Sequence, residues 1–271
     1  MRLERLVQIA NQAKTDAQKN RVGNALLKLM DEVECHPERL LYKKNKDTLK
    51  ITSGINKIGE GAYGAVFYGC LDDKCQTRVA IKFSKKSLKS EYQIGKKLAA
   101  LGVAPRVYRY GYCPAKKMEF IYYEYASHGS VEDFVKKYRS ASDYKAIIYQ
   151  VYALLRKVKK VYPSYRHYDL HPGNVLVNLE RGKLRLLLTD FGMSEMKGIK
   201  SPLLTKTWKR DQAPDEFVFT YHLGKDAGNR APPSAKKFFR DFSSSSDDAM
   251  KHPFMKGAHR AVLKVPGVYK E

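Results

Sequence analysis

Short apolar runs separated by glycines and turn residues fill the chain from about residue 50 to residue 126. The clearest runs, 78–83, 103–108 and 118–126, are rich in Val, Ile, Phe and Tyr. This texture predicts β-strands, because β-branched and aromatic side chains suit a pleated, half-buried surface. We therefore expect a small β-rich region that ends at the turn residues 127–130.

Helical spacing of apolar residues dominates the chain on both sides of this region. Residues 1–50 are expected to be mostly helical, with a break near Pro37. Ser130 is expected to cap a helix that carries Glu132 and Asp133 in its first turn. The apolar face of residues 142–161 predicts a longer helix that supports the loop following it.

Oxygen-bearing side chains cluster around that loop, residues 166–174. Asp169 precedes Asn174 by five residues, with a proline and a glycine between them. Two apolar runs then predict a short hairpin that ends at Asp190. Phosphoryl transfer from a nucleotide uses such a set, in which one carboxylate faces the accepting hydroxyl while an amide and a second carboxylate hold Mg²⁺. The simpler interpretation is a surface loop followed by a buried strand.

A glycine-rich stretch lies upstream, with Gly59, Gly61 and Gly64 followed by Val66. This spacing also occurs in dinucleotide-binding turns, where a helix starts near the third glycine. Here residues 65–68 continue as a strand. We therefore expect a strand-loop-strand flap whose backbone can approach phosphates, because no Cβ obstructs it.

Lys82 lies inside the apolar run 78–83, where an ammonium group is costly to bury without a partner. One interpretation is that it binds nucleotide phosphates, and the alternative is an edge-strand lysine that points to water. Residues 90–98 have helical periodicity, and Glu91 is the acid among them. Glu91 is thus the expected partner of Lys82.

Composition limits the class of protein. The chain has 271 residues, of which 43% are hydrophobic, so a sizeable core can form. Lys and Arg number 51 against 28 Asp and Glu, a net charge of +23. This charge favours acidic or nucleic-acid-associated partners, although scattered lysines are more typical of a solvated surface than of direct nucleic-acid binding.

The chain shows no apolar run long enough to span a bilayer and no signal-peptide core after Met1. We therefore expect an intracellular protein, in the cytoplasm or nucleus of a host cell or in a virion. Four irregularly spaced cysteines are then expected to be reduced thiols, and they do not form the two close pairs that zinc sites use.

Taken in order, the glycine loop, Val79-Ala80-Ile81-Lys82, Glu91, the loop with Asp169 and Asn174, and Asp190-Phe191-Gly192 resemble the motifs of the protein kinase family. The resemblance covers about residues 50–216 and is strongest for eukaryotic-type serine/threonine kinases. It implies an α+β, two-lobed fold with a small β-rich N-lobe at about 51–126 and a shortened helical C-lobe at about 127–271, preceded by a helical extension at 1–50.

The same resemblance implies a role for each matched residue. Asp169 would accept the proton of the substrate hydroxyl, Lys82 and Glu91 would align the phosphates, and Asn174 and Asp190 would bind Mg²⁺. Residues 118–126 resemble the kinase hinge, with Tyr123 behind the adenine. ATP would be held by Gly59, Gly61, Gly64, Val66, Ala80, Lys82, Glu124 and Ala126.

Two residues depart from the family pattern. Tyr168 replaces the arginine that in many kinases pairs with a phosphorylated activation loop, so control by that route is not expected. His171 replaces a lysine usual in serine/threonine kinases. After Gly192 the match weakens, since Asp215 interrupts an Ala-Pro-Glu-like stretch and could instead open the central helix of a shortened lobe.

These departures leave other functions open. The loop around His171 also resembles those of atypical and small-molecule kinases, so the alternative is a phosphotransferase acting on a small molecule or lipid. A pseudokinase scaffold is a third hypothesis. A compact, basic kinase of this kind would suit a large DNA virus or a bacterial effector.

Overall fold

The computed structural model describes residues 57–61, 64–70, 77–114, 117–180, 183–204, 213–242 and 246–263. The helical extension expected over residues 1–50 lies outside these ranges. The described residues divide into two compact units. The first unit contains the described residues up to Ser87 and Tyr108–Glu124. The second unit contains Leu88–Val107 and the described residues from Tyr125 onward. No helix among the described residues is long and apolar enough to cross a membrane.

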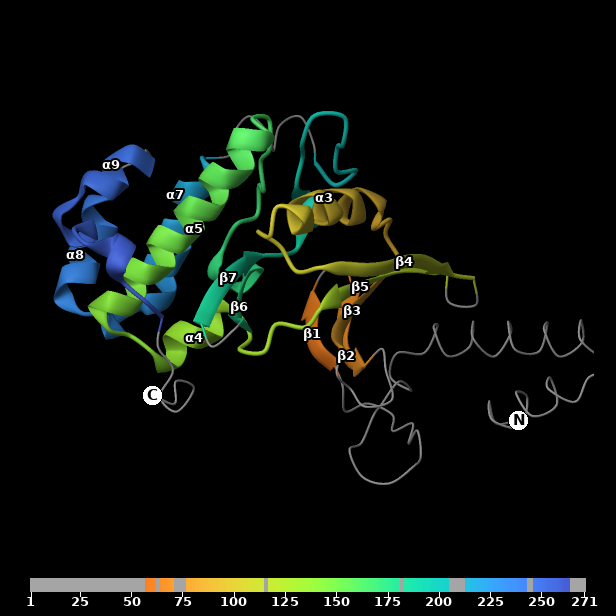
Figure 1. The fold of residues 1–271 in the computed structure, drawn as a ribbon, viewed down its shortest axis with the longest axis horizontal. Helices are drawn as coiled ribbons and strands as arrows, with labels where there is room; N and C mark the ends of the chain where they lie inside the picture. The colour runs from red at the N-terminus through yellow and green to blue at the C-terminus, as the bar shows by residue number, and fades with distance from the viewer. Residues whose placement is uncertain are drawn as a thin grey trace, which may run out of the picture. The chain divides into compact units, whose positions relative to one another are not determined.

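A five-stranded sheet makes up most of the described part of the first unit, in the order β1-β2-β3-β5-β4 (Figure 1). Its β1–β2, β2–β3 and β3–β5 pairs are antiparallel. Alternate residues of β3 (Val79, Ile81 and Phe83) are buried and pack with aromatic residues of β5 as a small core. The strands are β1 (Lys57–Gly61), β2 (Gly64–Cys70), β3 (Arg78–Ser84), β4 (Val107–Cys113) and β5 (Met118–Glu124).

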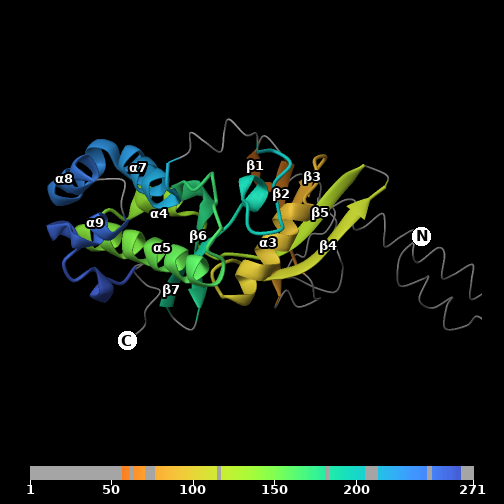
Figure 2. The same ribbon diagram turned by 90° about the horizontal axis from the view of Figure 1, so that it is seen from above.

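Helices make up most of the second unit, and its hairpin pairs β6 with β7 in antiparallel fashion. In both ribbon views α7 and α8 lie beside α5, the longest helix (Figures 1 and 2). The elements are α3 (Lys89–Ala100), α4 (Val131–Lys137), α5 (Ala141–Val161), η2 (Pro172–Asn174), β6 (Val175–Glu180), β7 (Lys183–Leu188), η3 (Phe191–Met193), α7 (Asp215–Ala227), η4 (Gly228–Arg230), α8 (Pro233–Asp241), α9 (Ser246–Lys251), η5 (Pro253–Met255) and η6 (Ala258–Arg260).

The long helix α5 forms where the apolar periodicity predicts it. Ser140 caps its N-terminus: its Oγ accepts a hydrogen bond from the backbone N of Asp143 at 3.1 Å. In return, the Asp143 carboxylate accepts from the backbone N of Ser140 at 2.9 Å, which completes a capping box. Ile147, Val151 and Leu155 on one face are fully buried. The helix is thus fixed at its start by polar bonds and along its length by the core.

Two local expectations of secondary structure needed correction. The strand predicted from Val103 begins only at Val107, because Val103 and Ala104 are buried in the core of the second unit and the Val103 carbonyl accepts from the backbone N of Leu188. The Gly, Pro and Asn residues in 224–235 predict a loop. This stretch is instead largely helical, since α7 continues to Ala227 and α8 begins at Pro233. Proline is tolerated there because the first turn of a helix leaves its N–H groups unpaired.

The expectation of reduced cysteines was also wrong for Cys113, at the end of β4. Its sulfur is disulfide-bonded.

Candidate active site

The loop before β6 brings Asp169 and Asn174 together. Asn174 closes the 3-10 turn η2, and its Nδ2 donates to the backbone oxygen of Asp169 at 2.8 Å and to Asp169 Oδ2 at 3.4 Å. Because both acceptors are oxygens, the amide nitrogen must be the atom that faces Asp169, and Oδ1 of Asn174 faces away from it. Asn174 is 8% exposed, so packing also holds it in place.

The electrostatic surroundings of Asp169 raise its proton affinity. Burial raises the pKa of the Asp169 carboxyl above its usual value, and the negative charge of Asp190 adds to the rise. The positive charges of His171 and His167 and the hydrogen bond from Asn174 lower this pKa in part. Two carboxylates that influence each other in this way form a site that favours a cation.

Asp190 follows β7 in a left-handed backbone conformation, with φ of 57° and ψ of 72°. This region is uncommon for residues other than glycine. Its side chain accepts from the backbone N of Gly192 at 3.4 Å, at the start of η3. A Cβ placed on Gly192 would lie 3.3 Å from Asp190 Oδ1 and 3.5 Å from Glu91 Oε2. The carboxylates of Asp190 and of buried Glu91 therefore both lie against Gly192.

Asp215 fixes the loop that carries Asp169, a role that the sequence did not reveal. It is the first residue of α7 and is 1% exposed. Its two carboxylate oxygens accept from the backbone N of His167 at 3.0 Å and of Tyr168 at 3.1 Å. The sequence feature that could have indicated this role is an acidic residue directly after Pro214, at the expected start of a helix. In the comparison with the Ala-Pro-Glu motif, however, Asp215 was only an extra residue that interrupts the match. The alternative expectation, that Asp215 opens a helix, is confirmed.

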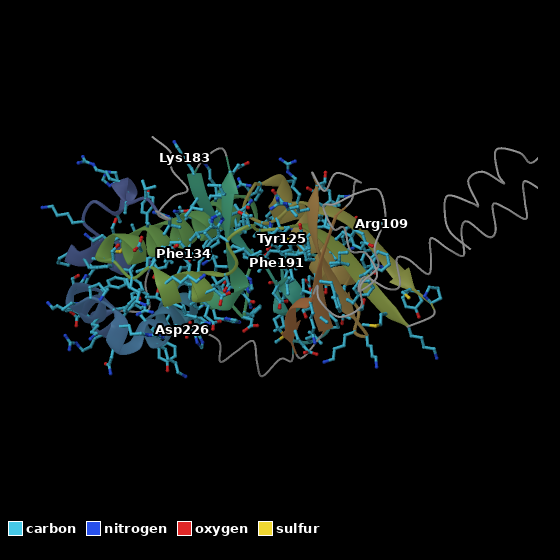
Figure 3. All side chains as sticks on the ribbon, turned by 90° about the horizontal axis from the view of Figure 1, so that it is seen from below. Arg109, Tyr125, Phe134, Lys183, Phe191 and Asp226 are labelled. Carbon is cyan, nitrogen blue, oxygen red and sulfur yellow. The ribbon has the colours of Figure 1, made fainter. Side chains whose placement is uncertain are left out.

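His167 ties the same loop to the segment after β7. Its Nε2 hydrogen-bonds the carbonyl oxygen of Thr189 at 3.0 Å, and its own carbonyl accepts from Ser194 Oγ at 3.2 Å. The His167 ring lies 5.6 Å from the ring of Phe191, which is fully buried (labelled in Figure 3). The peptides of Asp169 and Asp190 are thus held by one shared network.

In the first unit, one face of the sheet carries Val66, Ala80 and Lys82. Val66 lies directly opposite both Gly59 on β1 and Lys82 on β3, and opposite residues of antiparallel strands share a face. Ala80 is two residues from Lys82 on β3 and therefore lies on the same face, and Tyr123, directly opposite Ala80 on β5, lies on this face as well. Lys82 lies on a central strand and is 9% exposed, so the edge-strand alternative is wrong.

The glycines of the first unit differ in whether the surrounding atoms leave room for a side chain. A Cβ on Gly64 would lie 1.9 Å from the carbonyl oxygen of Phe83, so the close approach of β2 to β3 excludes a side chain. A Cβ on Gly59 would lie 3.7 Å from Val66 Cβ, an ordinary contact. Packing therefore requires glycine at 64 but not at 59. Gly61 pairs with Gly64 across the β1–β2 turn.

The two expected hinge residues fall in different units. Glu124 ends β5 in the first unit and is half-buried, whereas Ala126 belongs to the second and is 7% exposed. Just beyond them, the carbonyl of Val177 accepts from the backbone N of His128 at 3.1 Å, which joins this segment to β6.

The side chains of Asp190 and Asn174 carry oxygen atoms of the kind that Mg²⁺ prefers as ligands. Among the described residues, no three His, Cys, Asp or Glu side chains are arranged to hold a metal ion. Mg²⁺ is usually bound by one or two carboxylates together with substrate phosphates and water. Asp190 and the Oδ1 of Asn174 provide a donor set of that size and type.

Comparison with known proteins agrees with the fold. Residues 53–220 match the family model described as "Protein kinase domain". The chain belongs to the protein kinase family, and its α+β architecture, with an antiparallel sheet in one unit and a mainly helical second unit, is the one expected from the sequence.

Three relatives from Arabidopsis thaliana show the range of similarity. The chain is 28% identical over 188 residues to the "Probable L-type lectin-domain containing receptor kinase V.3", covering 63% of this chain and 27% of that protein. It is 24% identical over 237 residues to the "Lectin-domain containing receptor kinase VI.3", covering 75% and 33%. It is 25% identical over 169 residues to a "Probable LRR receptor-like serine/threonine-protein kinase", and this match covers 56% of this chain and 15% of that protein. The chain thus spans a third or less of each relative.

Proposed function

We propose that this chain is an ATP- and Mg²⁺-dependent protein kinase that phosphorylates serine and threonine hydroxyls of protein substrates. The observation that carries the proposal is the arrangement around the loop. Asn174 is hydrogen-bonded to Asp169, and Asp190 is near enough to raise the pKa of Asp169. Membership of the protein kinase family supports it.

In this proposal Asp169 orients the acceptor hydroxyl and takes its proton, while Asn174 and Asp190 hold the metal. Bound there, Mg²⁺ would neutralise charge on the phosphate oxygens during transfer. The hydrogen bonds from His167 and Tyr168 to Asp215 keep the Asp169 peptide in place, so positioning and not new covalent chemistry is what the loop supplies.

Most of the residues proposed to bind the nucleotide belong to the first unit. Lys82 would bind the α and β phosphates, with Glu91 as its partner, and the Gly59, Gly61, Gly64 and Val66 flap would cover them. Ala80, Glu124 and Ala126 would surround the adenine. The shared face of Val66, Ala80 and Lys82 supports this assignment, because it puts an apolar surface for a base beside a cation for phosphate.

The acceptor class is the least constrained part of the proposal. Serine/threonine specificity rests on the resemblance and on what distant relatives are called. Acidic or nucleic-acid-associated substrates and an intracellular place of action rest on sequence composition alone. The alternative acceptors are small alcohols and lipids, to which the His171 loop is also suited.

The test uses radiolabelled ATP, Mg²⁺ and a panel of proteins, small alcohols and lipids. Asp190→Asn should lower the rate of transfer about 10³-fold or more, since it removes charge where a cation must bind. Lys82→Met should lower it by orders of magnitude as well. Asp241→Asn, at an exposed acid on α8, is the matched control and should leave the rate unchanged. Melting temperatures should confirm that all variants fold.

Unchanged turnover in Asp190→Asn would remove the proposed metal site. Label that appears only in small alcohols or lipids would replace the protein-kinase proposal by the phosphotransferase alternative. Nucleotide binding without transfer to any acceptor would favour the pseudokinase.

A further inference from the structure

Arg166 contacts both ends of residues 195–213, the stretch that links the site around Asp190 to α7. Its backbone forms an antiparallel bridge with Glu195, with N···O distances of 3.0 and 2.9 Å. Its side chain reaches the other end, where Nη2 donates to the carbonyl oxygen of Ala213 at 2.7 Å. One residue therefore joins the start and the end of this stretch.

The guanidinium group of Arg166 also supports the loop that carries Asp169. Its Nε lies 3.5 Å from Asp215 Oδ2, an ion pair with the buried carboxylate that accepts the His167 and Tyr168 N–H groups. Its central carbon lies 4.9 Å from the centre of the Tyr168 ring, over its face. Tyr168 is held at φ of 64°, in the left-handed region, directly before Asp169.

Left-handed backbone persists at a residue other than glycine only where its surroundings fix it. At Tyr168 the surroundings are the Asp215 carboxylate on one side and the Arg166 guanidinium over the ring. Arg166 supplies the positive charge that buried Asp215 needs, as well as the stacking surface. The conformation of the peptide next to Asp169 therefore depends on Arg166.

We propose that Arg166 is a positioning residue that holds the Asp169 loop in its transfer-competent conformation without a phosphate on residues 195–213. The inference rests on the proposed function and names its regulation. Tyr168 has no charge with which to bind a phosphate. The guanidinium group of Arg166 does carry a charge, but it is already engaged with Ala213, Asp215 and Tyr168.

The hydroxyl of Ser201 fits the same interpretation. Serine or threonine occurs at three positions between 195 and 213, namely Ser201, Thr205 and Thr207. Ser201 is 5% exposed; its Oγ donates to the carbonyl oxygen of Gly192 at 2.5 Å and accepts from the backbone N of Leu203 at 3.1 Å. In this arrangement Ser201 is a structural residue and not an accessible phosphate acceptor.

Lysine should not replace Arg166 fully. A planar guanidinium can donate to a carbonyl, pair with a carboxylate and stack on a ring at the same time, whereas an ammonium is a point charge on a flexible stem. Arg166→Lys keeps a charge for Asp215, and so it should fold. Arg166→Met removes charge and donors while keeping much of the stem.

The experiment measures kcat and KM for ATP and for a protein acceptor, with phosphate occupancy checked by mass spectrometry. Dephosphorylated wild type and Thr205→Ala/Thr207→Ala should keep kcat within about 3-fold. Arg166→Met should lower kcat about 100-fold and Arg166→Lys about 10-fold, both with KM for ATP nearly unchanged. Arg185→Met is the matched control, because Arg185 pairs with Glu180 on the β6–β7 hairpin. It should keep the wild-type kcat.

A merely structural role would lower the melting temperature of Arg166→Lys and leave its kcat, measured well below that temperature, equal to wild type. That result would overturn the inference. Wild type that is active only when Thr205 or Thr207 is phosphorylated would overturn the inference alone. Wild type that transfers phosphate to no acceptor in either state would overturn the proposed function and the inference with it.

Discussion

Asp169 is the residue at which burial and charge act most directly on the proposed chemistry. A base must be ionised to accept a proton, so the rate should fall as the pH drops through the pKa of Asp169. Because burial raises this pKa, the acid limb of kcat/KM should lie above the usual range of an aspartate. This places the limb where ordinary buffers can follow it.

Changing His171→Asn should move that limb to still higher pH. Protonated His171 carries a positive charge that lowers the pKa of Asp169, and asparagine, which cannot carry that charge, lets the pKa rise further. When its ring is neutral, His171 Nδ1 accepts a hydrogen bond from the backbone N of Gly173 at 3.2 Å, and asparagine keeps an acceptor for that N–H. The measurement is the pH profile of kcat/KM for both proteins. A limb that stays in place or moves to lower pH would show that His171 does not act through charge.

The two glycines at 59 and 64 offer a second residue-scale prediction. Gly64→Ala should destabilise the protein by about 1–3 kcal/mol, because its Cβ would overlap the Phe83 carbonyl. Gly59→Ala should leave stability within about 0.5 kcal/mol, yet weaken ATP binding if phosphates approach the backbone there. Denaturant unfolding and ATP titration separate the two effects. Equal stability of both variants would contradict the assigned contacts.

At the scale of elements, the sequence predicts best where independent local signals agree. The long helix was expected at about 142–161 and is found at Ala141–Val161, because apolar period and capping residues agree. The helix after Ser130 and the hairpin after Asn174 are confirmed for similar reasons. The roles assigned to Lys82, Glu91, Asp169, Asn174 and Asp190 stay predictions, even though the structure brings the last four together.

Features that depend on distant contacts could not be predicted. Nothing local shows that Asp215 accepts from His167 and Tyr168, which are more than forty residues earlier in the chain. The same holds for Arg166, whose partners lie on both sides of a long segment. Residues 224–235 look like loop from composition, yet α7 continues through Gly224 because α8 packs against it there.

Gly224→Ala should test this crossing of α7 and α8. Alanine favours helix by about 1 kcal/mol over glycine, but its Cβ would lie 2.9 Å from Phe239 Cγ, at the rigid root of that ring. Overpacking costs about 1–3 kcal/mol, so we expect a net loss of stability. Lys225→Ala, at the exposed next position, should be nearly neutral. A Gly224→Ala protein more stable than wild type would mean that α8 shifts at little cost.

For the whole molecule, burial makes the surface more basic than the net charge indicates. Among the described residues, the acids Glu91, Asp143, Asp215 and Glu216 are all less than 10% exposed. Exposed lysines, in contrast, occur on α3, α5, α8 and in the turn at Lys197. The field that an approaching substrate meets is therefore set mainly by cations.

This field predicts salt-dependent choice of substrate. For two peptides with the same serine, one flanked by Asp and Glu and the other by neutral residues, KM should be lower for the acidic peptide at low salt. The difference should shrink as salt rises from about 0.1 to 1 M, because the screening length falls from about 10 to 3 Å. Steady-state kinetics at each salt concentration measure both values, and kcat should change little. Equal salt dependence for the two peptides would mean that the 51 basic residues serve solubility and not recognition. Tighter binding of a basic peptide would instead indicate that the acids around His171, Glu132 and Asp226 among them, dominate the local field.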